Sequence, residues 1–268
     1  MKSLIEILFL GDIVGRPGRI AVQQYLSALE IQPDFIVANV ENASHGFGLT
    51  EKNYNELTEA GIDILTSGNH IWDKKDIFNY IDRAPALLRP LNFSKTVPGK
   101  GSEIFEKDGI KIGVINLLGR VFMPPYESPW EALETEVKRL KEQTPIIFVD
   151  FHAEATAEKI GLGYYAQSLG VSVLVGTHTH VQTADETILS GTTAYITDAG
   201  SCSVVDSIIG MDMAGSLKRF ITGLPERYDV AQIGRTRING VKISIDTKTG
   251  NALEIKRINE LIDIKEVG

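Results

Sequence analysis

The alternation of short apolar runs with longer segments of helical period is the feature that most constrains how this chain can fold. Near the N-terminus it predicts strands and helices in turn, namely Leu4–Leu10, Pro17–Leu29, Asp34–Val40, Glu51–Ala60 and Ile62–Thr66. Such an alternation is typical of β-α-β units, in which consecutive strands run parallel. We therefore expect an α/β fold, with Pro17 in a first helical turn and Thr50 as a helix cap.

The pattern continues through the middle of the chain and then changes. A hairpin is predicted around Asp108-Gly109, and further strands and helices are predicted at Ile110–Leu117, Trp130–Glu142, Ile146–Asp150, Thr156–Leu169 and Val171–Val175. After Tyr195–Thr197 the alternation is lost, and antiparallel strands are predicted from Val230 onward, with Val241–Asp246 and Ala252–Ile258 joined by the Thr249-Gly250-Asn251 turn. Because the sequence has no repeat, low-complexity tract or linker, we expect residues 1–268 to form a single domain with mixed sheets.

Composition narrows the class of protein. Of the 268 residues, 43% are hydrophobic and 23% are charged, which excludes collagen, coiled coils and disordered polymers. Acidic residues outnumber basic ones by 35 to 27, and the net charge of −8 disfavours binding to a long nucleic acid but not to a small anionic substrate. The sequence shows no signal-peptide cleavage site, no apolar stretch of about 20 residues and one cysteine, so we expect a cytoplasmic protein without membrane contact.

Acidic, amide and imidazole side chains follow the predicted strands at the points where those strands end. In open α/β sheets, ligands bind in the crevice at the carboxyl ends of the strands, so residues far apart in sequence can share one site there. We expect such a site to contain Asp12, Glu41, Asn42, Asn69, His70, His152, His178 and His180.

These donors suit metal ions. Carboxylate and amide oxygens with imidazole nitrogens favour first-row metals such as Mn, Fe or Zn, whereas the lack of thiolates argues against a structural zinc site. Glu41 could bridge two cations, which is the clamp used on phosphate esters. Gly11, Gly68 and Gly176 would let the backbone turn sharply beside the ions.

Each motif also has a structural interpretation. Asp12 could be a solvated turn carboxylate, Glu41-Asn42 could cap the next segment, and His70 or His152 could be a satisfied structural histidine. The pair His178 and His180 alternates, which on an extended segment would point both rings to the same side. Four of the five histidines follow strands, and we expect the fifth, His45, to be loop surface.

Other reactive residues are weaker candidates. Arg16 and Arg19 could bind a substrate phosphate near a helix start or be solvated. Cys202 lacks a partner at a recognised spacing and is expected to be a buried small hydrophobe. Four residues near the motif loops could contact a base or ribose, although a Tyr or Trp at such spacing is more often packed than stacked on a base: Asp73, Asn92, Tyr126 and Trp130.

The order of the motifs resembles that of the calcineurin-type metallophosphoesterases. The series is Gly11-Asp12, Glu41-Asn42, Gly68-Asn69-His70, His152 and Gly176-Thr177-His178-Thr179-His180. The bacterial YmdB-type branch is similar in two finer strings, Gly11-Asp12-Ile13-Val14-Gly15-Arg16-Pro17-Gly18-Arg19 and Val40-Glu41-Asn42-Ala43. That branch also lacks the usual His at the position of Val14, and it has Glu rather than Asp at the position of Glu41. The resemblance covers nearly the whole chain. It fails at Gly200-Ser201-Cys202-Ser203-Val204-Val205-Asp206, where the branch usually has Gly-Met-Thr-Gly-Pro-Tyr-Asp, so the resemblance implies no substrate preference or subunit contact for this loop.

The resemblance implies a fold and a set of roles. The fold is a four-layer α-β-β-α sandwich of two mixed sheets. One ion would be held by Asp12, Glu41, Asn42 and His180, and the other by Glu41, Asn69, His152 and His178. His70 would be the proton donor. The implied cofactors are two first-row ions, Fe or Mn, with Zn or Mg as alternatives.

The expected activity is hydrolysis of a small cyclic nucleotide, a 2′,3′-cyclic nucleoside monophosphate, by a metal-bridging hydroxide. The expected partner is therefore a small phosphoester, and the chain could form a homo-oligomer. Two other functions stay open from the sequence: a phosphomonoesterase or nucleotidase using the same ions, and a regulatory protein that binds metal or nucleotide without turnover.

Overall fold

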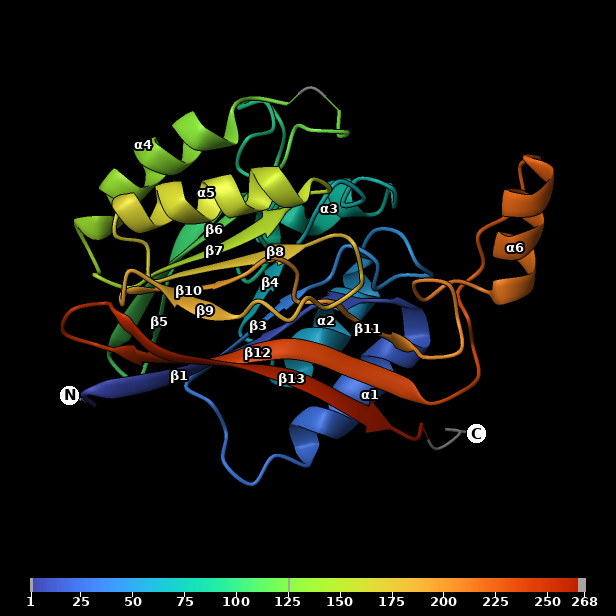
Figure 1. Cartoon of the computed structure of the whole chain (residues 1–268), viewed down its shortest axis with the longest axis horizontal. Coiled ribbons are helices and arrows are strands. Elements are labelled where there is room, and N and C mark those ends of the chain that lie inside the picture. Colours follow the sequence, from blue (N-terminus) through green and yellow to red (C-terminus); the bar gives the residue numbers. More distant parts are fainter. Residues whose placement is uncertain (1, 125, 265–268) are drawn as a thin grey trace.

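The computed structural model describes residues 2–124 and 126–264, and in these residues two mixed β-sheets pack face to face between layers of helices (Figure 1). The first sheet has the order β2 (Asp12–Ile13), β11 (Ser201–Val204), β12 (Thr236–Asp246), β1 (Leu4–Leu10), β3 (Phe35–Asn39) and β4 (Ile64–Thr66), and β13 (Ala252–Ile262) pairs with β12. The second has the order β5 (Ser102–Lys107), β6 (Ile110–Leu118), β7 (Ile147–His152), β8 (Val173–Thr177), β10 (Thr193–Ile196) and β9 (Thr187–Leu189).

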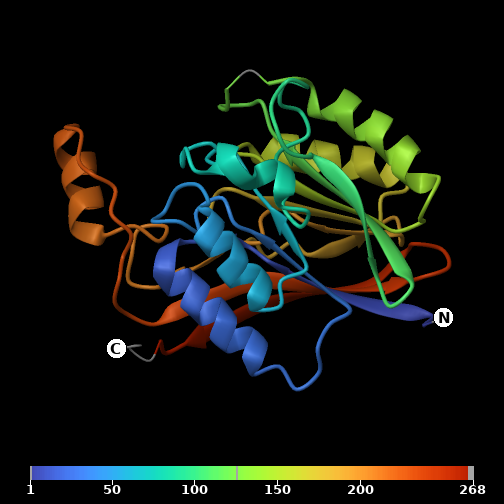
Figure 2. The same ribbon diagram turned by 180° about the vertical axis from the view of Figure 1, so that it is seen from behind.

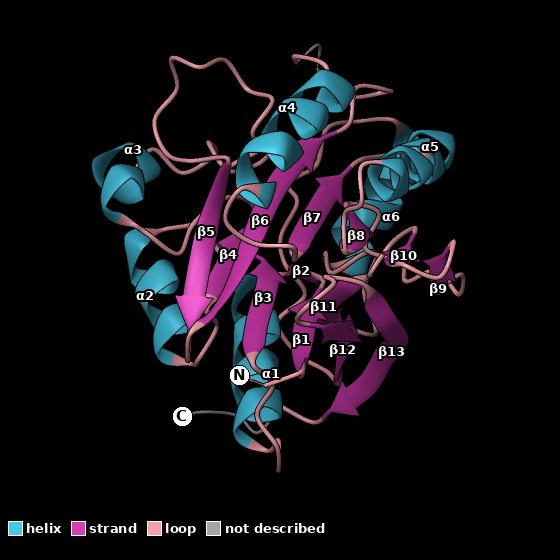
Figure 3. Ribbon diagram, turned by 90° about the vertical axis from the view of Figure 1, so that its left-hand side faces the viewer, coloured by secondary structure: helices cyan, strands magenta, loops and turns pink. Residues whose placement is uncertain are grey.

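Helices cover the outer face of each sheet. The first sheet carries α1 (Gly15–Ser27), α2 (Glu51–Glu59), the short α3 (Ile77–Tyr80) and the 3-10 turn Ile81–Arg83, while the second carries α4 (Pro129–Lys141) and α5 (Thr156–Ser168). Figure 3 shows these layers from the side, with α4 and α5 above the strands and α1 and α2 on the other side. One helix, α6 (Met213–Thr222), stands away from the body of the molecule (Figures 1 and 2).

The strand β1 shows why the sequence forms this sandwich. Its alternate residues Ile7 and Phe9 point into the core between the sheets, where the ring of Phe9 lies 5.5 Å from that of Phe148. Leu8 and Leu10 instead pack in the core beneath α1 and α2. Because both faces of the strand are buried, its sequence is a nearly continuous apolar run rather than an alternating one.

Strand direction gathers the sequence motifs at one edge. β1, β3 and β4 run parallel to one another, as do β6, β7, β8 and β10 in the second sheet. The carboxyl ends of the two parallel sets meet, since the backbone N–H of His178, after β8, donates to Asp12, after β1. The expected four-layer α/β sandwich is thus confirmed.

Most of the expected elements are found within two or three residues of their limits. The side chain of Thr50 accepts a hydrogen bond from the N–H of Asn53, as a cap should, and the hairpin around Asp108-Gly109 joins β5 to β6. The antiparallel pairing of β12 with β13 is also as expected. None of the helices in the described part of the chain is long and apolar enough to cross a membrane.

Helix α6 was not expected from the sequence. Its capping signals are nevertheless present, because the side chain of Asp212 accepts from the N–H of Gly215 and Gly223 ends the helix with φ of 69°. The apolar residues Leu217, Phe220 and Ile221 are exposed rather than packed on a sheet. A helix that contributes nothing to the core leaves no β-α-β signature, so its caps were the available signal.

Candidate metal centre

Two buried carboxylates link the motifs that follow the strands. Asp12 accepts a hydrogen bond of 3.0 Å from the N–H of His178, and Glu41 accepts one of 3.0 Å from the N–H of His70. Asp12 and Glu41 are 0% and 1% exposed. Each carboxylate is therefore held by the backbone of a motif from a different strand, and the expected site is assembled across both sheets.

The first group of converging donors is Glu41, His152 and His178. The Nε2 atom of His152 lies 3.1 Å from Oε1 of Glu41 and 3.0 Å from Nδ1 of His178. One ligand atom from each of the three residues lies within 4.8 Å of the others. An ion about 2.1 Å from two ligands at right angles leaves those ligands about 3 Å apart, so the two ring nitrogens are spaced to share a first-row ion.

The second group is Asp12, Asn42 and His180. Nε2 of His180 is 3.2 Å from Oδ1 of Asn42 and 3.9 Å from Oδ2 of Asp12. The other ring nitrogen, Nδ1, donates to the carbonyl oxygen of Ile209 at 2.8 Å. Since that bond places the proton on Nδ1, Nε2 is left as the atom that can bind a metal.

Two of the expected ligands carry oxygens that the protein leaves without a hydrogen bond. Among the described residues, Oδ1 of Asp12 and Oδ1 of Asn69 are buried acceptors with no hydrogen-bond partner. Buried polar atoms are normally paired, because removing them from water is costly. A cation would satisfy both oxygens, so the donor set fits the metal ions that the sequence implies.

Gly68 is required for close approach. A Cβ atom at this position would lie 2.3 Å from Oε2 of Glu41 and 2.4 Å from Nε2 of His152, filling the space between the ligands. Gly68, Gly11 and Gly176 do not have positive φ, so the backbone conformation at these positions does not itself require glycine. At Gly11 and Gly176 a Cβ would collide with the carbonyl oxygens of Gly200 and Thr197. These glycines let neighbouring backbone pack against the site.

A buried carboxylate, that of Asp150, fixes the orientation of the His152 ring through a hydrogen-bonded threonine. Asp150, 0% exposed, accepts hydrogen bonds from Asn39 at 2.9 Å, Thr66 at 2.5 Å and Thr177 at 2.7 Å. Because the Thr177 hydroxyl donates its one proton to Asp150, it accepts from Nδ1 of His152, 2.9 Å away. This chain fixes the ring so that Nε2 faces Glu41.

Burial and neighbouring charge set the protonation of the site. Burial raises the pKa of Asp12 to about 7, against the opposing charges of His152 and His180. For His178, burial and then the charge of His152 lower the pKa to about 3, so this ring is neutral, as a metal ligand must be. Burial would also raise the pKa of Glu41, but His152 lowers it to about 2 and the carboxylate is charged.

The geometry of the histidine pair differs from the one expected. The φ angles of His178 and His180 are 104° and 64°, so the segment turns at both residues and is not extended. The rings consequently reach different partners, His178 facing His152 and His180 facing Asn42. Periodicity could not reveal this, because the turn depends on contacts with other strands. Glu154, whose carboxylate lies 3.0 Å from Nε2 of His178, was also missed.

His70 lies at the rim of the same site. Its Nδ1 atom is 2.8 Å from Oδ2 of Asp73, and its ring is 4.8 Å from that of Phe47. Asp73 was left open as a contact for a base or ribose, and the structure pairs it with the histidine three residues earlier. His70 and Glu41 line a pocket of about 350 Å³.

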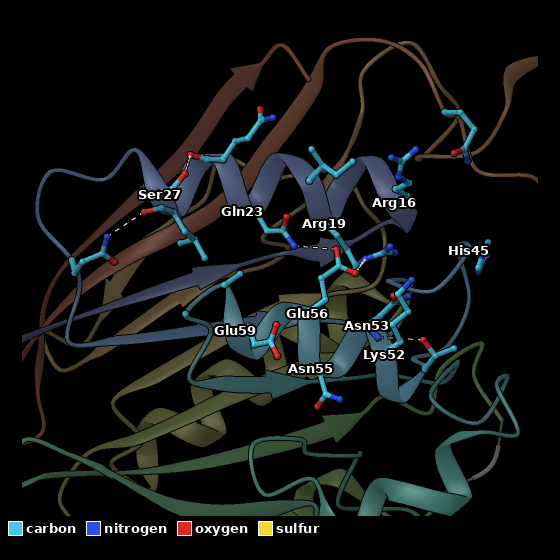
Figure 4. A pocket seen from close by; sticks show the side chains of 18 residues that line it. Arg16, Arg19, Gln23, Ser27, His45, Lys52, Asn53, Asn55, Glu56 and Glu59 are labelled. Carbon is cyan, nitrogen blue, oxygen red and sulfur yellow. Dashed lines mark hydrogen bonds and ion pairs between the residues drawn. The ribbon is translucent and has the colours of Figure 1, made fainter. Parts of the chain in front are cut away.

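A larger groove of about 1670 Å³ runs between α1 and α2, away from these donors (Figure 4). Arg19 crosses it, donating to Glu56 on α2 at 2.9 Å and to the carbonyl oxygen of Ala43, while Gln23 also donates to Glu56. Arg19 thus links α1 to α2 through Glu56 rather than serving as a phosphate ligand.

Two minor expectations are confirmed, those for Cys202 and His45. Cys202 is fully buried, and burial raises its pKa to about 12, so it is no nucleophile. His45 is exposed in its loop. The amide of Asn92 is buried and donates to two backbone carbonyls, those of Leu118 and Glu127.

Comparison with known proteins now identifies the family. A family model described as YmdB-like protein matches residues 8–258, which include every candidate ligand. The chain belongs to the YmdB-like family. It is 49% identical over 256 residues to the 2′,3′-cyclic-nucleotide 2′-phosphodiesterase of Bacillus subtilis (strain 168), covering 95% of this chain and 96% of that protein.

Solved structures agree with the YmdB-like assignment. The crystal structure of a novel phosphatase from Mycoplasma pneumoniae matches with a TM-score of 0.90 and 34% identity, covering 98% of this chain and 95% of the other. The NAD nucleotidase of Haemophilus influenzae shares the fold at 13% identity, with a TM-score of 0.53, over 99% of this chain and 59% of its own. The resemblance in the motifs is therefore confirmed at the level of family and fold.

Proposed function

We propose that this chain is a metal-dependent phosphodiesterase that hydrolyses 2′,3′-cyclic nucleoside monophosphates. The observation that carries the proposal is the set of converging donors around Glu41, together with the buried Oδ1 atoms of Asp12 and Asn69, which have no hydrogen-bond partner among the described residues. The 49% identity to a 2′,3′-cyclic-nucleotide 2′-phosphodiesterase supports the choice of substrate. The complete motif series argues against a regulatory protein without turnover, because such a protein would be expected to lack a ligand or the acid.

We assign one metal position to each of the two groups of donors, and we assign Glu41 to both positions. We assign Asp12, Glu41, Asn42 and His180 to one ion and Glu41, Asn69, His152 and His178 to the other. Iron or manganese suits these oxygen and nitrogen ligands, with zinc or magnesium as alternatives. Bound ions would supply a hydroxide nucleophile at neutral pH and neutralise charge on the phosphoryl oxygens.

The chain itself supplies the proton for the leaving group. We assign this role to His70, which lines the pocket beside Glu41 and Asn42. Asp73 accepts from Nδ1 of His70 and orients the ring, so that Nε2 can deliver a proton to the departing ribose 2′ oxygen. No side-chain nucleophile is needed, which agrees with the inert Cys202.

A substrate panel tests this function. Metal-free protein would be reloaded with each ion and given 2′,3′-cyclic AMP, 2′,3′-cyclic UMP and nucleoside 5′-monophosphates. We expect cyclic substrates to be opened to nucleoside 3′-monophosphates. Turnover of 5′-monophosphates with no reaction of the cyclic diesters would instead support a nucleotidase.

A further inference from the structure

We propose that Phe47 and Tyr228 form an aromatic platform that stacks the nucleobase of the substrate. Tyr228 belongs to the strap, defined here as residues 205–230, which includes α6. The proposal rests on the proposed function and adds to it the part of the pocket that recognises the base.

The pocket has two chemically different walls. One is polar and consists of residues at the strand ends and beside them: Glu41, Asn42, His70, Glu154, His178, Thr179 and His180. The other is apolar and consists of Phe47, Ile209, Met211 and Tyr228. Its volume of about 350 Å³ lies near the lower end for small-molecule sites, which suits a mononucleotide. A nucleotide has the same division, with an anionic phosphate at one end and a flat base at the other.

Phe47 lies next to His70, on the side toward which the base of a bound nucleotide would project from its ribose. Its ring lies 4.8 Å from His70 at an angle of 65°. Since His70 protonates the ribose oxygen, the ribose lies beside His70 and its base lies within reach of the next ring. Phe47 packs on a small buried cluster of Val14, Met211 and Val230, which fixes the position of the ring.

Tyr228 extends this wall. Its ring is 6.5 Å from that of Phe47 and is 36% exposed. The guanidinium carbon of Arg219, on α6, lies 4.5 Å from the centre of the Tyr228 ring, an arrangement that holds the phenol by a cation–π contact. An exposed ring that is braced by a cation and lines a polar pocket is suited to stack a base.

One hydrogen bond connects the strap to His180, and another connects two residues of the strap to each other. Ile209 accepts from Nδ1 of His180 at 2.8 Å, and the N–H of Asp212 donates to the carbonyl oxygen of Asp229 at 2.7 Å. These bonds hold Tyr228 in a fixed relation to the donors at the strand ends. Because a purine offers a larger face than a pyrimidine, the platform should favour 2′,3′-cyclic AMP over 2′,3′-cyclic UMP.

A base-free substrate isolates the effect of stacking. The wild-type protein would be loaded with Mn²⁺ and assayed with 2′,3′-cyclic AMP and with 1-O-methyl-ribofuranose 2,3-cyclic phosphate, which lacks the base. We expect KM for the base-free ester to be at least about 10-fold higher. Equal KM values would overturn the proposal without any variant being made.

Variants then assign the effect to Tyr228. Tyr228→Ala should lower the preference for 2′,3′-cyclic AMP over the base-free ester, measured as the ratio of kcat/KM values, by about 10-fold. Tyr228→Phe keeps the ring and should retain that preference, as should Phe220→Ala, a matched aromatic truncation on exposed α6. Tyr228→Leu serves as a second truncation with more bulk. Unchanged preference in both Tyr228→Ala and Tyr228→Leu would overturn the proposal.

A binding measurement separates the failure of this proposal from that of the proposed function. Adenosine 3′-monophosphate and ribose 3-phosphate would be titrated into the Mn²⁺-loaded protein by calorimetry, and the nucleotide should bind at least about 10-fold more tightly. Equal affinities in a protein that hydrolyses 2′,3′-cyclic AMP would overturn the platform alone. Failure of the loaded wild type to hydrolyse any cyclic nucleotide would overturn the proposed function.

Discussion

The strand ends and the strap both line one pocket, yet they are built in different ways. Asp12 and His152, at the strand ends, are each 0% exposed and are held by strands of both sheets. On the strap, Phe220 and Ile221 are 69% and 81% exposed. The difference teaches that the scaffold fixes the groups that perform chemistry, whereas a loosely packed loop carries the groups that select the substrate.

The two regions also differ in how closely their sequences follow the family pattern. The motif strings at the strand ends follow the family pattern, while Gly200–Asp206, which leads into the strap, departs from it. The first part of that stretch is still anchored, because Ser201 of β11 pairs with Asp12 of β2. Substitutions at the strand ends should therefore affect metal binding and turnover most, and substitutions on the strap least.

The largest effect is expected at the carboxylate shared by both metal positions. Glu41→Gln replaces a charged ligand by a neutral one of the same shape and should lower kcat by about 1000-fold or more, with loss of bound metal. Metal content by mass spectrometry and turnover of 2′,3′-cyclic AMP measure this. Glu56→Gln, on α2, is the matched control and should keep both. A Glu41→Gln protein with full metal and normal turnover would break the comparison.

The next effect is expected at the proton donor. His70→Ala should lower kcat by about 100- to 10,000-fold while metal content stays at the wild-type level, because His70 acts as an acid and not as a ligand. His45→Ala, which truncates an exposed side chain, is the control. Normal turnover by fully loaded His70→Ala would show that the assigned role is wrong.

A smaller effect is expected beneath the site, where Thr177 orients His152. Thr177→Val removes the hydroxyl that links His152 to Asp150 and should weaken binding of one ion by about 10- to 100-fold. Thr177→Ser keeps the hydroxyl and should restore the affinity. Calorimetric titration with Mn²⁺ checks both variants. Equal affinities for the Val and Ser variants would mean that the chain from Asp150 does not support the ligand.

The smallest effect is expected on the strap. Phe220→Ala should change the free energy of unfolding by no more than about 0.5 kcal/mol, because the side chain is exposed and buries little area. Phe148→Ala, between the sheets, should cost about 3–5 kcal/mol. Urea unfolding compares the two. A large loss on truncating Phe220 would show that α6 is covered in solution and that its apolar side chains are not exposed there.

The sequence predicted those parts of the fold that rest on local pattern. Strands buried on both faces, such as β1, produce apolar runs that are easy to recognise, and Thr50 is a readable cap. The candidate ligands could be selected because each follows such a strand. Their convergence needs only the general geometry of parallel sheets and not the details of packing.

Contacts between distant segments could not be predicted in the same way. The turns at His178 and His180, the link from Asp150 through Thr177 to His152, and the pairing of Glu154 with His178 depend on how neighbouring strands pack. Helix α6 was missed because it buries no apolar face. Asp73 lies three residues after His70, a spacing that could have signalled the pair.

The most direct test of the central claim is to count metal ions while following turnover. Metal-free protein would be titrated with Mn²⁺, and bound ions per chain would be compared with the rate of 2′,3′-cyclic AMP hydrolysis. The account predicts two bound ions per chain and a rate that rises with occupancy. Full activity in the metal-free protein, or no binding of divalent ions, would contradict it.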